Sequence, residues 1–122
     1  MRRQLLLLLA LVCMAGSAAH AATVTYFSGF SGSAEASPNA SAGSGSLSLA
    51  YDEDANTLKV MLDFSGLTGT TTAAHIHCCS GPGVNSAVAV ALDGFATGVT
   101  AGTYNVLFDL SDPGVYAASF LS

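Results

Sequence analysis

Basic residues are nearly absent from this chain. Its 122 residues contain three Lys and Arg against eight Asp and Glu, and two of the three are Arg2 and Arg3. After position 21, Lys59 stands alone against all eight acidic residues, a formal net charge of −7. Nucleic-acid binding requires Lys and Arg to neutralise phosphates, so this balance disfavours nucleic acid, anionic lipid and phosphorylated substrates. A cation, or a basic patch on a partner protein, suits the charge better.

The sequence also lacks an apolar run long enough to span a membrane. The longest run, residues 5–14, follows Arg2 and Arg3 and is shorter than the roughly 20 residues that a spanning helix needs. Small residues then lead to Ala19-His20-Ala21, the small-x-small pattern of a signal peptidase site. We therefore expect residues 1–21 to form a helical signal peptide that is cleaved. Residues 22–122 would be a single exported domain, secreted or periplasmic, with no stable membrane span.

Motifs of common catalytic sites are missing as well. The chain has no nucleophile elbow, no phosphate-binding loop and no Cys-x-x-Cys pair. With no Arg and one Lys after position 21, little is left to stabilise negative charge in a transition state. We therefore expect no enzymatic activity.

What the sequence does contain is alternation of apolar and polar residues, which is typical of strands. Period-two runs predict strands at 22–30, 47–51, 57–64, 88–92 and 104–110. Residues 31–46 are rich in Gly and Ser and predict a long loop, with an edge segment around Glu35; residues 52–56 predict a tight hairpin. The expected fold is all-β, an antiparallel β-sandwich, for instance immunoglobulin-like, or a partly open barrel.

The candidate site is the run His75-Ile76-His77-Cys78-Cys79. In a strand, alternate side chains lie on the same face, so His75 and His77 would project together. If the strand continued unbroken, Cys79 would join them, and copper or zinc would accept this set of nitrogen and sulfur ligands.

Each of these residues has an alternative interpretation. The two imidazoles can instead be hydrogen-bonded to the backbone or to an acid such as Asp63 or Asp93. In an oxidising compartment, Cys78 and Cys79 can form a vicinal disulfide, bind a metal, form bridges between chains or remain inert thiols. The sequence leaves these alternatives open.

Several segments spread along residues 22–122 resemble one family. They are Phe64-Ser65-Gly66-Leu67-Thr68-Gly69, Ala73-Ala74-His75-Ile76-His77 and Gly81-Pro82-Gly83-Val84-Asn85, with Glu35, Pro38 and Asn39 before them, Asn56-Thr57-Leu58 in the hairpin, and Ser111-Asp112-Pro113 through Tyr116 and Phe120 after them. The family that they resemble is the CHRD domain, which is the repeated module of chordin and also occurs alone in secreted bacterial proteins.

This chain departs from the family in two places. Members usually continue past the position of Leu121 into further segments, so the resemblance implies a domain that lacks its last strands and has an unpaired sheet edge. Cys78-Cys79 stands where small residues are common. The resemblance implies a secreted, nonenzymatic binding or interaction module that binds a protein partner, or itself, through an exposed β edge.

A weaker similarity covers the same histidines. Gly66-Leu67-Thr68 before His75-Ile76-His77 is similar to copper, zinc superoxide dismutases, in which a His-x-His pair binds copper on a β-sandwich. This similarity implies that the expected all-β fold is superoxide dismutase-like. Such an enzyme needs further histidines and an arginine, and the chain has neither after position 21. The alternative function is therefore a copper- or zinc-binding β-sandwich built on His75, His77 and Cys79, with Cys78 beside them, and not a dismutase.

Overall fold

A computed structural model describes residues 22–122, so the expected signal peptide lies outside the described residues. The fold is all-β, as predicted, and its two sheets do not close into a barrel. The elements are β1 (Val24–Ser31), the short 3₁₀ helix η1 (Gly32–Ala34), β2 (Ser44–Asp52), β3 (Thr57–Ser65), β4 (His75–His77), β5 (Val88–Ala91), β6 (Gly102–Asp109) and the 3₁₀ helix η2 (Pro113–Val115).

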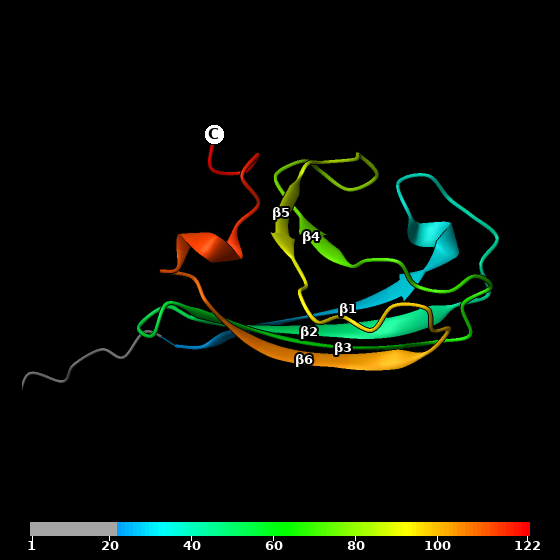
Figure 1. Ribbon diagram of the computed structural model, residues 1–122, viewed down its shortest axis with the longest axis horizontal. Coiled ribbons are helices and arrows are strands. Elements are labelled where there is room, and N and C mark those ends of the chain that lie inside the picture. The colour runs from blue at the N-terminus through cyan, green and yellow to red at the C-terminus, as the bar shows by residue number, and fades with distance from the viewer. Residues whose placement is uncertain (1–21) are drawn as a thin grey trace, which may run out of the picture.

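Four strands form the main sheet, in the order β1-β2-β3-β6, and every neighbouring pair is antiparallel. The other two strands, β4 and β5, form a small antiparallel sheet that stands on the main one (Figure 1). An isolated bridge joins Val90 to Tyr116, and the Ala117 N–H donates to the Ala89 carbonyl at 2.8 Å. The C-terminal segment thus extends the small sheet on the β5 side, and together they make the second layer.

The core lies between the two layers. Its centre is Val60, which is completely buried, and Leu92 and Tyr104 pack around it. The register places Val60 opposite Leu49 and Val106, so these residues share a face. We call this the inner face of the main sheet; on β1, Val24, Tyr26, Ser28 and Phe30 belong to it by the same register.

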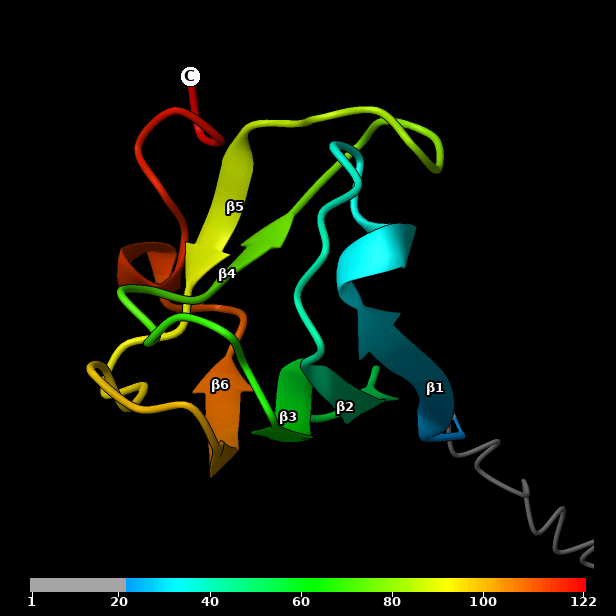
Figure 2. The same ribbon diagram turned by 90° about the vertical axis from the view of Figure 1, so that its right-hand side faces the viewer.

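The second layer covers only part of the inner face. Figure 2 shows β4 and β5 above β6 and β3, whereas β1 lies at the far side of the sheet. In consequence Val24 and Tyr26 are exposed, although they lie on the face that buries Val60. We call the β1 part of the inner face, namely Val24, Tyr26, Ser28 and Phe30, the open face.

The strand predictions hold with shifted ends. The hairpin between β2 and β3 is confirmed, and Asn56 adopts a positive φ of 49° in it. The loop prediction for 31–46 is wrong at both ends, because β1 reaches Ser31 and β2 begins at Ser44. The edge segment expected around Glu35 is instead η1 followed by irregular chain. Within residues 22–122, no helix has the length and apolar character needed to cross a membrane.

Candidate functional site

Both histidines lie on β4, as the alternation predicts. Ile76 packs against the core cluster, while His75 and His77 are exposed and line one pocket. Their ring centroids are 5.8 Å apart and the ring planes are nearly perpendicular, at 88°. The period-two geometry therefore brings the two imidazoles together.

The strand ends immediately after them, at His77. Its register with β5 is already irregular between Ile76 and His77, and Cys79 has a φ of 111°. A non-glycine residue with that φ leaves the extended conformation. The condition for placing Cys79 beside the histidines, an unbroken strand, is therefore not met.

Cys78 and Cys79 form a vicinal disulfide, with their Cα atoms 3.6 Å apart. Of the four alternatives for this pair, the structure has the disulfide between the two neighbouring residues. Both residues are exposed, in the loop that joins β4 to β5. Because each sulfur is bonded to the other, neither is available as a thiolate ligand in this state.

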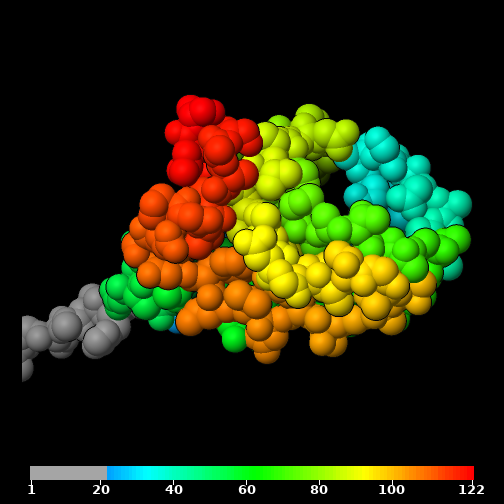
Figure 3. Space-filling model, viewed as in Figure 1, coloured from blue at the N-terminus to red at the C-terminus, as the bar shows by residue number. Residues whose placement is uncertain are grey.

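The pocket lies between β4 and the segment after β1 and has a volume of about 530 Å³, within the range of small-molecule sites. Figure 3 shows the hollow between these two parts of the chain. One wall is the η1 segment, closed by a hydrogen bond from the Asn39 N–H to the Gly32 carbonyl at 2.8 Å. The opposite wall is β4, which pairs with β5 and with no other strand of residues 22–122.

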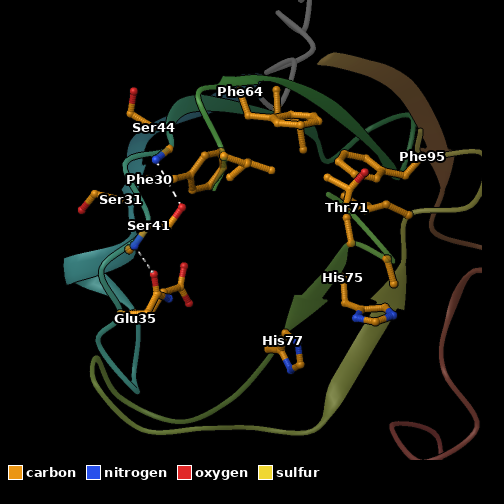
Figure 4. A pocket seen from close by; sticks show the side chains of 18 residues that line it. Phe30, Ser31, Glu35, Ser41, Ser44, Phe64, Thr71, His75, His77 and Phe95 are labelled. Carbon is orange, nitrogen blue, oxygen red and sulfur yellow. Dashed lines mark hydrogen bonds between the residues drawn. The ribbon is translucent and has the colours of Figure 1, made fainter. Parts of the chain in front are cut away.

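The lining of the pocket is apolar at its base and polar at its rim. Phe64 and Phe95 stack at 5.4 Å, and Phe30 lies beside them on the β1 side (Figure 4). Glu35 lies on the η1 wall and His77 on the β4 wall (Figure 4). Phe30 also belongs to the open face, so the open face continues into the pocket.

The sequence left the backbone or an acidic side chain as alternative hydrogen-bond partners of the histidines, and His77 has a backbone partner. The His77 Nδ1–H donates to the Ser86 carbonyl at 2.8 Å, which leaves Nε2 without its proton in the neutral ring. The prediction that Asp63 or Asp93 accepts a hydrogen bond from a histidine is wrong. The carboxylate of Asp63 accepts from the Ser46 hydroxyl, and both residues lie on the other face of the main sheet. Asp93 uses its backbone carbonyl to accept from the Tyr104 hydroxyl at 3.0 Å.

The geometry does not assemble the predicted metal ligands. Among residues 22–122, no group of three or more His, Cys, Asp or Glu side chains is placed to hold an ion. The two imidazoles remain close to each other, but the sulfurs are used in the disulfide. Metal binding by His75, His77, Cys78 and Cys79 therefore stays a prediction, which the disulfide form does not suit.

Sequence reasoning missed the aromatic base of the pocket. Phe30, Phe64 and Phe95 come from β1, β3 and the segment after β5, and no sequence spacing links them. The sequence placed Glu35 in an edge segment and in a family resemblance but assigned it no role in a site, and the fold places it across the pocket from the histidines. The one available signal was that Phe30 and Phe64 fall on the apolar faces of their strands.

Comparison with known families agrees with the segments quoted above. Residues 26–117 match the family described as the CHRD domain, a span that includes the pocket walls and both histidines. No curated protein and no solved structure matches the chain. The match covers most of the sequence and confirms the resemblance. The chain belongs to the CHRD domain family.

Proposed function

We propose that this protein is a secreted, nonenzymatic interaction module whose open face and pocket bind an extended segment of a partner protein. CHRD domains are extracellular-type modules, which supports an interaction role at the level of the family. The observation that carries the proposal is the exposure of Val24 and Tyr26 on the face that forms the core elsewhere in the sheet. Apolar side chains gathered on an uncovered face are typical of binding sites.

The shape of the site favours an extended chain over a bulky one. The open face runs along β1 into the pocket, and β4 borders the pocket with its unpaired side. A segment that lay along β4 could make backbone hydrogen bonds there and place alternate side chains over Phe30 and its aromatic neighbours. Such β-strand addition needs no catalytic group.

The charge of the site further restricts the class of partner segment. Glu35 lines the pocket, and the only Lys or Arg after position 21 is Lys59. Lys59 alternates with Val60 on β3 and so lies on the opposite face of the main sheet, which we call the outer face. A bound segment with apolar residues and one Lys or Arg near Glu35 would complement the site, and its charge would favour association with a chain of net charge −7.

The test is crosslinking and affinity capture from the extracytoplasmic fraction of the producing cells. We expect the unchanged protein to capture a partner that Tyr26→Glu loses, because Tyr26 is on the open face. The matched control is Leu107→Glu. Leu107 is 58% exposed, against 60% for Tyr26, but lies on the outer face. Capture of nothing, or equal capture by all three proteins, would refute the proposal.

The proximity of His75 and His77 supports a second candidate, a copper or zinc site. It requires reduction of the disulfide, so that Cys79 and Cys78 become thiolates able to join the imidazoles. Metal analysis of untagged protein, titrated with Cu or Zn with and without a thiol reductant, tests this candidate. A stoichiometric ion that is bound only after reduction and is lost in His77→Ala would support it. No bound ion under either condition would remove it.

A further inference from the structure

The free edge of β1 has no charged residue, no proline, no bulge and no short length to protect it against pairing with another chain. β1 pairs with β2 and with no other strand of residues 22–122, so the backbone groups along its other edge have no strand partner. Edge strands are commonly protected by charge, proline, a bulge or short length. The eight residues of β1, Val24–Ser31, contain no charged residue and no proline, and their register with β2 is continuous.

The apolar side chains of β1 are exposed on both faces of the sheet. Tyr26 is 60% exposed on the inner face, and Phe27 is 80% exposed on the outer face. The opposite edge strand, β6, ends in Asp109 and exposes one large apolar side chain, Leu107. β4, the other strand with an open side, has only three residues. A strand added beside β1 would therefore bury more apolar surface than a strand added at either other edge.

We infer that two copies of this protein pair through their β1 strands, antiparallel and related by a twofold axis, to form one continuous eight-stranded sheet. Twofold symmetry makes the contact self-complementary, since each copy offers the same strand. Opposed residues must lie on the same face of the sheet, so a residue pairs with one of the same parity. The register that places Phe27 opposite Phe27 also places Val24 opposite Phe30 on the inner face.

This register makes the cross-strand pairs that stabilise sheets. Phe27 meets its copy as an aromatic pair, and Val24 with Phe30 is a β-branched residue against an aromatic one. Phe27, the most exposed of the large apolar side chains of residues 22–122, is thereby covered. Val24, which the second layer leaves uncovered, gains a neighbour on its own face.

The charge distribution of the chain also favours β1 as the strand through which two copies pair. The chain after position 21 carries a net charge of −7, so two copies repel each other in general. β1 has no charge of its own, and the repulsion there comes only from more distant groups, which salt screens. We expect the dimer to tighten as the salt concentration rises from about 0.05 M to about 0.5 M, where the Debye length shortens.

The proposed dimer shares Val24 and Phe30 with the open face, but it can be tested apart from the partner site at Phe27. Phe27 lies on the outer face and does not line the pocket, so a change at Phe27 should leave partner capture intact. Loss of capture in Tyr26→Glu tests the proposed function, and the association state of Phe27→Glu tests the dimer. Either can fail without the other.

The experiment is sedimentation equilibrium of the protein purified in the form that its cells produce, compared with Phe27→Glu and the charge-matched control Leu107→Glu. We expect the unchanged protein and Leu107→Glu to dimerise, and Phe27→Glu to dimerise at least about tenfold more weakly, because two like charges would face each other. Circular dichroism checks that each variant is folded. In parallel, mild oxidation should link the two copies of Phe27→Cys by a disulfide, whereas Leu107→Cys should dimerise through β1 without a covalent crosslink. A monomeric unchanged protein, equal weakening by both glutamates, or equal crosslinking of both cysteines would overturn the inference.

Discussion

Two parts of the inner face of the main sheet differ in what covers them. At β3 and β6, the second layer buries Val60 completely and leaves Tyr104 only 6% exposed. At β1, the same face leaves Val24 44% and Tyr26 60% exposed. Alternation along a strand therefore determines which face is apolar, whereas burial depends on whether another layer packs on that face. The covered part stabilises the fold, and the uncovered part leaves apolar side chains exposed to solvent.

The sharpest comparison makes one substitution in both parts. Val60→Ala should lower the free energy of unfolding by about 2 to 3 kcal/mol, since it removes buried methyl groups and leaves a cavity. Val24→Ala deletes the same atoms where they are exposed and should change stability by less than about 0.5 kcal/mol. Urea denaturation of both variants measures the difference. Equal losses would mean that β1 is covered in solution, as it would be in part by the dimer.

The boundary between the two parts can be tested at Gly45 of β2. A Cβ atom there would collide with the backbone oxygen of Asp63 and approach Phe30 Cδ2 to 2.9 Å. Gly45→Ala should therefore cost about 2 kcal/mol by overpacking.

The matched control for Gly45→Ala is Gly29→Ala in β1. The nearest atom to a Cβ on Gly29 is 3.8 Å away, and this substitution should be neutral or slightly stabilising. Thermal unfolding of the Gly45→Ala and Gly29→Ala variants measures the difference in stability between them. A tolerated alanine at position 45 would show that the sheet around the pocket is looser than described.

The two parts should also differ in their response to pH. Burial raises the pKa of the Tyr104 hydroxyl above its usual value of 10.0, and the nearby Asp93 charge raises the pKa further. The neutral form is thus favoured in the folded state. Its stabilising contribution is complete below about pH 10 and is lost as the pH rises through the folded-state pKa.

Tyr104→Phe should remove that pH dependence. It should also cost about 1 kcal/mol at neutral pH, because the hydroxyl no longer donates to the Asp93 carbonyl. Stability measured from pH 8 to pH 11 would show the difference, with Tyr26→Phe in the uncovered part as the control. If the free energy of unfolding of the two phenylalanine variants depends on pH in the same way, the buried Tyr104 hydroxyl is not the cause of the loss of stability at high pH.

The smallest effect is expected at the vicinal disulfide. Cys78 and Cys79 are exposed, lie outside the core cluster and enclose almost no chain between them. A crosslink stabilises mainly by restricting a long loop of the unfolded chain. Reduction, or replacement of both residues by Ser, should therefore change the free energy of unfolding by less than about 0.5 kcal/mol. Unfolding on addition of a thiol reductant would contradict this and would give the disulfide a structural role.

Sequence reasoning predicted the parts of this protein that depend on local pattern. Alternation located five strands and the β2–β3 hairpin, and it placed His75 and His77 on one side of β4. It could not predict that β4 ends at His77, because that end depends on the pairing of β4 with β5 and on the turn at Cys79. The predicted addition of Cys79 to the histidine face fails for this reason.

The sequence by itself determined the all-β class, the apolar side of each strand and a charge that disfavours acidic partners, since these follow from residue order and composition alone. Only the tertiary structure decided that β4 and β5 cover β3 and β6 but not β1, and that Phe30, Phe64, Glu35 and the histidines line one pocket. These residues are far apart in the chain. Their proximity depends on how the two layers pack, because a strand's period specifies a direction for each side chain but not what it meets.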